Sequence, residues 1–530
     1  MKNTIQPKPK DSSRYLISIS FFVILFIASA CQAQLTSKDL SQLNLIPIPV
    51  AITPDVGAFE ITDRTAIYVN KGDTQLEDIA NYLSEFLQKS TGFNLPVKNV
   101  DQFSKDAISL ELTNSNGFKN PEGYSININN DVIKIQANEP QGIFRGIQTL
   151  RQLLPARIEQ ESQKGPWTIA SGSILDYPQY EYRGAMLDVS RHFFAVDDVK
   201  RFIHFVATYK MNKLHLHLSD DQGWRIEIKS WPKLTEYGGS TEVGGGEGGY
   251  FTQEDYKEII DYAQERYIEV IPEIDMPGHT NAALASYPEL NCNDEAPDLY
   301  TGTEVGFSSF CTDKEVTYKF IDDVIGELAA ITPGKYIHIG GDESHSTDKE
   351  DYIQFINKVQ DIVYKHGKTM IGWDEIQNAQ LRKESVTQFW ASEENALGAV
   401  KQESKLIMSP AKKAYMDMQY DSNSPLGLHW AGYIEVDTGY NWNPSSYVKG
   451  ITKDDILGVE APLWTETIQT INDIEYMIFP RLAGFAEIGW SQDSLRNWES
   501  YKNRLLNHYE RLEAMDVNFY KSKVVASEKL

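Results

Sequence analysis

Two adjacent carboxylates, Asp342 and Glu343, follow the pair of glycines that ends the apolar segment Ile337-His338-Ile339-Gly340-Gly341. The apolar residues before the glycines predict a buried strand that stops abruptly. Acidic side chains just beyond such a strand are where α/β enzymes place acid and base chemistry. On this segment alone a second interpretation stays open, because the two carboxylates could also cap a following helix.

Further polar and aromatic residues follow other strand-like segments in the second part of the chain. In chain order they are Asp188, Arg191, Asp220, Asp221, Asp275, His279, Trp373, Trp390, Tyr415, Asp417, Trp464 and Glu466. If the strands form one barrel, these side chains meet at one mouth. Carboxylates and arginine bind hydroxyls, and indole faces cover the apolar side of a sugar ring, so this lining favours a neutral polyol as the ligand.

A metal centre is the competing interpretation of the same residues. Its candidate ligands are Asp220, Asp275, His279, Asp342 and Glu343. However, no His-x-His or His-Glu-x-x-His spacing lies at a predicted strand end, and His215 and His217 alternate with leucines inside a strand. We therefore predict that these two histidines are hydrogen-bonded core residues. We also predict no metal and no cofactor, since no glycine fingerprint follows the first strand.

The elements that must position these residues alternate between strand and helix across residues 180–525. The predicted strands are 184–189, 213–218, 267–273, 335–339, 369–372, 386–389, 405–408 and 456–459. The amphipathic segments 198–209, 253–266 and 315–328 predict helices between them. Two capping boxes are expected, at Thr252 with Asp255 and at Thr312 with Glu315. Eight strand–helix repeats predict a (β/α)8 TIM barrel in the α/β class.

The region 40–175 predicts a smaller α+β domain that packs against the barrel. Its strand-like segments are 66–69, 107–112, 124–128 and 132–135, and its helical segments are 76–88 and 139–154. Asn138 is the expected cap of the second helix. No residue in this domain suggests catalysis.

The first 30 residues predict an export signal. Basic residues precede an apolar run from Leu16 to Ala30, which is too short to span a bilayer comfortably. The run ends Ala28-Ser29-Ala30-Cys31, which is typical of a bacterial lipoprotein signal with Cys31 as the lipidated residue; ordinary signal cleavage is the alternative. We expect a periplasmic or outer-membrane protein that reaches the membrane only through its lipid.

Charge and cysteine content narrow the classes of partner and compartment. The net charge of −25 excludes nucleic acid and an anionic membrane surface as natural partners. Cys292 and Cys311 remain once Cys31 is set aside, and an exported chain permits one disulfide between them. Two free thiols are the alternative.

Seven segments, in order, resemble the family 20 glycoside hydrolases, the β-N-acetylhexosaminidases. They are Arg183-Gly-Ala-Met-Leu-Asp-Val-Ser-Arg-His-Phe193, Leu214-His-Leu-His-Leu-Ser-Asp-Asp221, Pro272-Glu-Ile-Asp-Met-Pro-Gly-His279, Ile339-Gly-Gly-Asp-Glu343, Gly372-Trp373, Tyr415-Met-Asp417 and Leu463-Trp-Thr-Glu466. The resemblance extends from about residue 40 to the end. It implies an exported enzyme that removes terminal N-acetylglucosamine, and N-acetylgalactosamine as a second candidate, from β-glycosides.

The resemblance also implies a role for each residue. Glu343 matches the general acid/base, Asp342 the carboxylate that holds the 2-acetamido N–H, and Tyr415 the hydroxyl on the acetamido oxygen. The pocket walls are matched by Trp373, Trp390 and Trp464, the clamps on the sugar hydroxyls by Arg191, Asp417 and Glu466, and a polar network near the acid by Asp220, His279 and the supporting Asp275.

Substrate-assisted catalysis explains why the two central carboxylates are neighbours, whereas most retaining glycosidases oppose two carboxylates across the sugar. The 2-acetamido oxygen itself attacks C1, so we expect Asp342 to be ionised and Glu343 to begin protonated. A non-catalytic glycan-binding lipoprotein is the alternative from another class. A lacto-N-biosidase-like or sulfated-sugar-specific relative is the alternative within the enzymes, although Arg191 and Glu466 favour release of a monosaccharide.

Overall fold

The structure is a computed structural model that describes residues 1–4, 6, 39–70, 72–100, 105–115 and 117–526 of the 530-residue chain. Residues 1–38 form one unit, and Asp39–Leu530 form a second unit, which contains a sheet and a barrel. The predicted apolar signal segment and Cys31 lie outside the described residues. Within the described part of the chain, no helix is both long and apolar enough to cross a membrane.

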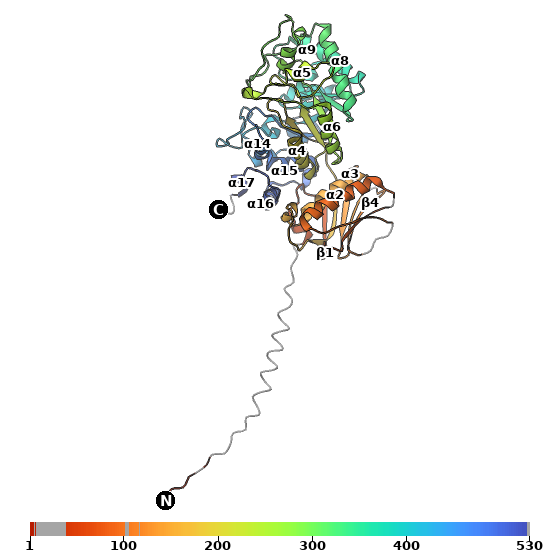
Figure 1. Ribbon diagram of the computed structural model, residues 1–530, viewed down its shortest axis with the longest axis vertical. Coiled ribbons are helices and arrows are strands. Elements are labelled where there is room, and N and C mark those ends of the chain that lie inside the picture. Colours follow the sequence, from red (N-terminus) through yellow and green to blue (C-terminus); the bar gives the residue numbers. More distant parts are fainter. Residues whose placement is uncertain (5, 7–38, 71, 101–104, 116, 527–530) are drawn as a thin grey trace. The chain divides into compact units, whose positions relative to one another are not determined.

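The first part of the second unit is a seven-stranded sheet in the order β1-β7-β5-β6-β4-β2-β3. The strands are β1 (Ala51–Glu60), β2 (Ala66–Val69), β3 (Val97–Asn99), β4 (Ala107–Leu112), β5 (Tyr124–Ile128), β6 (Val132–Ala137) and β7 (Thr168–Asp176). The helices α2 (Thr74–Thr91) and α3 (Pro140–Leu153) lie over the sheet (Figure 1) and bury apolar residues at helical spacing against it.

The sequence missed three of these strands and misplaced one cap. β1 carries Pro54 and Gly57 and is mostly exposed, so it lacks the alternation that reveals a half-buried strand. It is held by antiparallel pairing to β7, more than 100 residues later in the chain. Asn138 does not cap α3: the cap position is Glu139, and the Asn138 amide instead bonds the backbone of Ser115.

The second part is a closed barrel of eight parallel strands, which confirms the predicted fold class. In chain order around the barrel the strands are β8 (Tyr182–Asp188), β9 (Lys213–His217), β10 (Glu269–Glu273), β11 (Tyr336–His338), β12 (Thr369–Trp373), β13 (Val386–Phe389), β14 (Lys405–Met408) and β15 (Ile456–Leu463). β10 begins two residues later than predicted, because Tyr267 has a left-handed φ of 55°.

Helices connect the strands in the expected alternation, apart from a 3-10 helix (Asp374–Asn378) as the connection from β12 to β13. The longer helices are α4 (Val196–Thr208), α6 (Gln253–Gln264), α8 (Glu315–Ile331), α9 (Lys349–Lys365), α10 (Glu393–Lys401), α14 (Ile471–Ile478), α15 (Arg481–Trp490) and α16 (Trp498–Ala514). The shorter ones are α5 (Lys233–Glu236), α7 (Asn281–Ser286), α11 (Ala411–Ala414), α12 (Val436–Tyr440), α13 (Pro444–Tyr447) and α17 (Lys523–Ala526).

Of the two predicted capping boxes, one is formed. Thr252 and Asp255 exchange side-chain and backbone hydrogen bonds at the start of α6. The Thr312 box is wrong, since α8 has Lys314 at its cap position with no side-chain capping bond.

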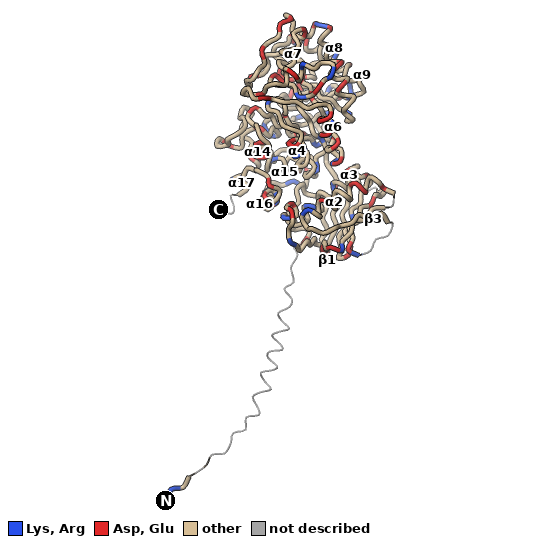
Figure 2. Tube along the Cα trace, in the orientation of Figure 1, with Lys and Arg blue, Asp and Glu red and all other residues tan. Residues whose placement is uncertain are grey.

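Buried ion pairs join the two parts of the unit. Glu122, just before β5, accepts hydrogen bonds from Arg145 of α3 and Arg183 of β8, at 2.9 and 2.6 Å. Lys210 donates to Asp176, at the end of β7, over 2.9 Å. Elsewhere acidic and basic residues are interspersed along the described trace (Figure 2), so the excess of acidic residues is spread along the chain.

Candidate active site

A cavity of about 220 Å³ opens at the carboxyl ends of the barrel strands. The sequence-predicted residues that line it are Arg191, His279, Asp342, Glu343, Trp390, Tyr415, Asp417, Trp464 and Glu466. The other lining residues are Thr303, Val305, Leu428 and Trp430. The barrel therefore brings side chains from Arg191 to Glu466, far apart in the chain, into one cavity.

A larger cavity, of about 660 Å³, lies at the amino ends of β9 and β10. Three of its four charged lining residues already have protein partners: Glu122 binds two arginines, and Lys213 forms an ion pair with Glu269 at 2.5 Å. No sequence-predicted site residue lines it. The smaller cavity is therefore the better candidate for chemistry.

The segment that carries the two central carboxylates is an irregular loop. Gly340 and Gly341 have φ angles of 65° and 99°, and a Cβ on Gly340 would lie 1.7 Å from Oδ1 of Asp275, so only glycine fits there. The next helix, α9, begins at Lys349 with Asp348 as its cap residue. The interpretation of Asp342 and Glu343 as helix caps is therefore wrong.

Asp342 lies deep in the pocket beside a second carboxyl group, Asp275. Oδ1 of Asp275 accepts the backbone N–H of Gly341 at 3.0 Å. Burial and neighbouring carboxylates raise the pKa of Asp275 to about 7 and raise the pKa of Asp342 well above its ordinary value. Oδ2 of Asp275, Oδ1 of Asp342 and Nε2 of His279 accept or donate no hydrogen bond within the described residues. Of these atoms, Oδ1 of Asp342 belongs to a residue that lines the cavity and is an acceptor for a ligand's amide N–H.

Glu343 is the more exposed of the pair and faces a histidine. Nε2 of His279 lies 3.6 Å from Oε2 of Glu343. Burial opposes the charge on His279, but Asp220, 3.1 Å from its Nδ1, raises the pKa of this imidazole well above the usual value. Burial alone would raise the pKa of Glu343, yet the imidazolium outweighs burial and lowers it.

The directions of the two pKa shifts are thus opposite to the sequence-based expectation. In the free protein, burial and charge favour protonation within the Asp275–Asp342 pair and ionisation of Glu343. The physical reason is position: Asp342 is buried beside another carboxyl, whereas Glu343 lies beside a cation.

Arg191 occupies the polar end of the cavity. Its Nη2 lies 2.8 Å from Oδ2 of Asp220 and its Nη1 lies 3.4 Å from Oδ2 of Asp188. The guanidinium also lies 4.8 Å from the ring centroid of Trp464, a cation–π contact. Two fixed carboxylates therefore orient a charged fork toward the cavity.

Asp417 and Glu466 are two further carboxyl groups in the cavity wall. Burial raises the pKa of both, and for Asp417 the neighbouring Glu466 adds to the effect. Both oxygens of Asp417 are buried and accept no hydrogen bond from the part of the chain that the structure describes. Such acceptors fit ligand hydroxyl groups.

Aromatic rings form the opposite wall. Trp390 and Tyr415 are stacked at 6.5 Å, and Tyr415 lies 6.2 Å from Trp464. The Trp390 indole N–H donates to Glu375 at 3.1 Å, which holds the ring in one orientation. Trp430 meets both Trp390 and Tyr415 edge-on and is 57 % exposed at the rim.

Three sequence-predicted residues lie beneath the cavity and not on its surface. Trp373 is fully buried and packs 5.7 Å from Trp464. Asp220 and Asp275 contact lining residues from below. Their side chains support the wall, and the structure gives them no surface in the cavity.

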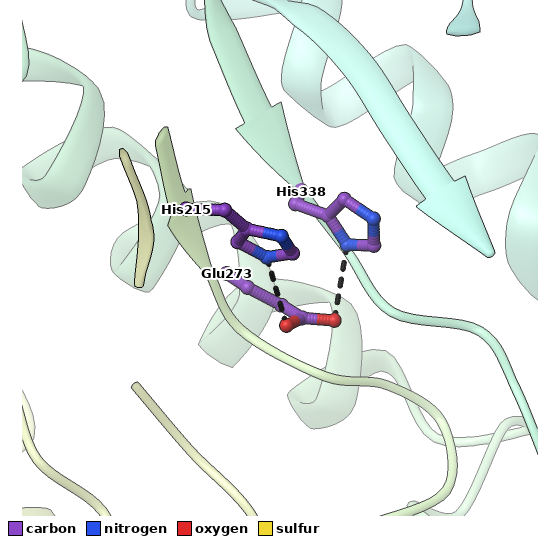
Figure 3. Close-up of side chains that lie close together, drawn as sticks. All are labelled: His215, Glu273 and His338. Carbon is purple, nitrogen blue, oxygen red and sulfur yellow. Dashed lines mark ion pairs between the residues drawn. The ribbon is translucent and has the colours of Figure 1, made fainter. Parts of the chain in front are cut away.

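Sequence reasoning missed the layer beneath these three residues. The carboxylate of Glu273 lies beside His215 and His338 inside the barrel (Figure 3), and it also contacts His217. His215 and His217 are buried and paired with carboxylates, as their alternation with leucines predicted. The signal for Glu273 was its position between Pro272 and Ile274, where a charged residue inside a buried strand needs a partner.

Several buried groups have the residue types of a metal site. They are His215–Glu273–His338, His217–Glu273–Asp275, Asp220–Asp221–His279 and Asp275–His279–Asp342, with ligand atoms within 4.8 Å of one another in each. Both nitrogens of His215 and of His217 already contact carboxylate oxygens at 2.5–2.9 Å. A metal there would have to break these ion pairs, so the first two groups fit a hydrogen-bonded core better than a metal.

A disulfide between Cys292 and Cys311 closes the loop that forms one side of the mouth. This loop supplies Thr303 and Val305 to the cavity. Ser308, near its end, donates to Asp221 at 2.5 Å, which ties the loop to the segment after β9.

The chain matches two family descriptions over most of its length. Residues 180–354 and 345–493 match "Glycosyl hydrolase family 20, catalytic domain", and residues 42–177 match domain 2 of the same family. A β-N-acetylhexosaminidase from Cellulomonas fimi is 37 % identical over 473 residues, which are 88 % of this chain and 94 % of that protein.

Solved structures with the same fold are also similar in sequence. A family 20 β-N-acetylhexosaminidase from Streptomyces coelicolor superimposes with a TM-score of 0.88 at 49 % identity, covering 90 % of this chain and 97 % of that one. A mutant β-hexosaminidase from Streptomyces plicatus, in complex with the product GlcNAc, gives 0.87 at 50 % identity, covering 90 % and 96 %.

Proposed function

Since this chain belongs to glycosyl hydrolase family 20, we propose that it is an exo-acting β-N-acetylhexosaminidase that releases terminal N-acetylglucosamine from β-glycosides. The observation that carries the proposal is the Asp342–Glu343 pair at the base of an enclosure lined by Arg191, Asp417 and four aromatic residues. A pocket of about 220 Å³ that is closed on its polar side suits one terminal sugar, which favours release of a monosaccharide over a disaccharide.

The mechanism follows from the placement of the carboxyls. Asp342 accepts the 2-acetamido N–H, Tyr415 donates to the acetamido oxygen, and that oxygen attacks C1 while the bond from C1 to the leaving oxygen breaks. Glu343 gives its proton to the leaving oxygen. Water then loses a proton to Glu343 and attacks C1, and the bond between C1 and the acetamido oxygen breaks. Two displacements at C1 leave the anomeric configuration retained.

Substrate binding has to redistribute the proton found in the free protein. An amide N–H donated to Asp342 favours its ionised form, because a carboxylate accepts hydrogen bonds more strongly than an acid. A sugar that covers Glu343 removes water from it, and burial raises a carboxyl pKa. The bound substrate thereby moves the proton toward the leaving oxygen, where it is used.

The proposal is tested by hydrolysis of an aryl N-acetyl-β-glucosaminide beside the matching β-glucoside, which lacks the amide. We expect turnover of the first only, and loss of that turnover in Glu343→Gln. Comparable hydrolysis of both sugars would refute substrate assistance. Binding of the sugar without turnover would favour a glycan receptor on the same fold.

We further propose that the protein is exported and anchored by a lipid on Cys31, facing the periplasm or held at the outer membrane. The support is the sequence alone: basic residues, a short apolar run and small residues before Cys31. Cys31→Ser should release the protein from the membrane fraction without changing its activity. Retention of the variant in that fraction would contradict lipid anchoring.

A further inference from the structure

A single buried carboxylate, Glu273, is connected both to the acid Glu343 and to the aromatic wall of the sugar pocket. Its Oε2 is 2.5 Å from Nδ1 of His217 and 2.9 Å from Nε2 of His215. Its Oε1 accepts the indole N–H of Trp373 at 2.9 Å and lies 3.0 Å from Nδ1 of His338. Figure 3 shows His215 and His338 approaching this carboxylate from neighbouring strands. The parallel register places Glu273 opposite both His217 and His338, which explains the convergence.

One chain of contacts leads from Glu273 to the acid. Nε2 of His217 lies 2.7 Å from Oδ2 of Asp220, and Oδ1 of Asp220 lies 3.1 Å from Nδ1 of His279. His279 in turn faces Glu343 at 3.6 Å. With a carboxylate on each of its nitrogens, the His217 ring has its plane and its charge set by Glu273 and Asp220 together.

A second chain leads from Glu273 to the sugar pocket. The Trp373 indole that it holds packs against Trp464, which lines the cavity. His338 accepts the backbone N–H of Gly340 at 3.0 Å, which is two residues before Asp342. The carboxylate therefore contacts the support of the pocket wall and the strand end that carries the catalytic pair.

We propose that Glu273 is a positioning residue that aligns the proton donor with the acetamido pocket, acting on Glu343 through His217, Asp220 and His279, and on the pocket wall through Trp373. Glu273 reaches neither the substrate nor the cavity surface. This role rests on the proposed function and deepens it, because one buried charge then holds both Glu343 and the pocket wall in their positions.

The barrel interior offers a matched control in Glu460. It is also buried, also contacts His215, at 2.8 Å, and is otherwise satisfied by Tyr182 and Gln388 at 2.5 and 2.7 Å. None of these contacts is with Asp220 or with Trp373. Glu460→Gln therefore removes a buried charge that contacts neither Asp220 nor Trp373 and, of the contacts named here, shares only His215 with Glu273.

The experiment compares kcat/KM for two substrates in the wild type, Glu273→Gln and Glu460→Gln, with thermal unfolding to establish the folded fraction. One substrate is the β-linked disaccharide of N-acetylglucosamine, whose leaving sugar needs a proton. The other is the dinitrophenyl N-acetyl-β-glucosaminide, whose leaving group needs none. For Glu273→Gln we expect a loss of about 100-fold on the disaccharide and about 10-fold on the dinitrophenyl glycoside, since a general acid contributes about 10²- to 10⁴-fold.

The ratio of kcat/KM for the disaccharide to kcat/KM for the dinitrophenyl glycoside separates positioning from folding. Glu460→Gln should leave this ratio at the wild-type value, whatever it does to stability. Trp373→Phe, which removes the indole donor and part of the buried ring, should lower kcat/KM for both substrates equally. If Glu273→Gln is unfolded, Glu273→Asp keeps the charge but withdraws the carboxylate, and the same shift in ratio is expected.

An unchanged ratio in the folded Glu273 variant overturns the inference, as does an equal shift in Glu460→Gln. Failure of the wild type to hydrolyse either substrate would refute the proposed function itself. The two failures are therefore distinguishable.

Discussion

Replacement of Asp275 by Asn should move the acid limb of the pH–rate profile to lower pH. The carboxylate oxygens of Asp275 and Asp342 lie within 4.8 Å of each other, and Asp275 raises the pKa of Asp342. Asn keeps an oxygen that can accept the Gly341 N–H now bound by Oδ1 of Asp275, but it removes the charge. Because Asp342 must ionise to accept the acetamido N–H, a lower pKa for Asp342 leaves the protein active in more acidic solution.

The size of the shift follows from Coulomb's law. Two unit charges at 4.8 Å, the greatest separation of the nearest oxygens, repel by roughly 3.5 kcal/mol at an effective dielectric constant of 20, equivalent to about 2.5 pH units if both groups are fully ionised. The pair shares one proton and His279 stays beside it, so we expect a shift of about 1 to 2 pH units. Glu273 and Glu343 also face Asp342 and are unchanged by the substitution.

The assay is kcat/KM against pH with the aryl N-acetyl-β-glucosaminide, because this ratio reports groups of the free protein. Asp221→Asn is the matched control: Asp221 is buried, accepts hydrogen bonds from Asn281 and Ser308, and is not among the groups that raise the pKa of Asp342. Its acid limb should stay in place. An acid limb in Asp275→Asn that does not move, or that moves upward, would refute the electrostatic reasoning.

Glu122→Gln should lower the free energy of unfolding by about 3 kcal/mol in urea titrations at neutral pH, because the folded pKa of about 2 lies below the ordinary 4.5. The wild type should lose this stabilisation as the pH falls from 4.5 through 2, and a pH-independent difference would contradict it. Tyr415→Phe should lower kcat about 100-fold with little change in KM, because it removes one hydrogen-bond donor to charge that develops in the transition state. Cys311→Ser should lower the free energy of unfolding by about 3 kcal/mol, because it opens the loop closed by the disulfide. It should also raise KM, because Thr303 and Val305 of this loop line the cavity and would move. An unchanged KM would show that the loop does not contribute to substrate binding. Chelators should leave activity intact, and loss of activity in folded protein would reinstate a metal at Asp275, His279 and Asp342.

Local patterns in the sequence were sufficient for the barrel and for the composition of its mouth. Apolar alternation followed by glycine or a polar residue marks where each strand ends, and parallel strands closed into a barrel bring those ends together. Asp342, Tyr415 and Glu466 lie on separate strand ends and still line one cavity, as that argument predicts. The seven ordered segments specified the chemistry more narrowly than any one of them.

Non-local pairing was beyond this reasoning. β1 has no local signal and exists because β7 pairs with it from more than 100 residues away. The exposed Trp430 lies in a segment without periodicity, and its contacts with Trp390 and Tyr415 depend on how the barrel loops pack. Trp373 was assigned to the pocket surface, but it is fully buried, packs on Trp464 and is not among the residues that line the cavity.

The sequence by itself determined which residue types stand at the strand ends, and therefore which reaction the mouth can support. Only the tertiary structure decided which carboxyl has a raised pKa and which a lowered one, because these shifts depend on the distance from Asp342 to Asp275 and from Glu343 to His279. These partners are more than 60 residues apart in the chain, and burial and Coulomb interaction act through space. The order of residues in the chain does not by itself give these two distances.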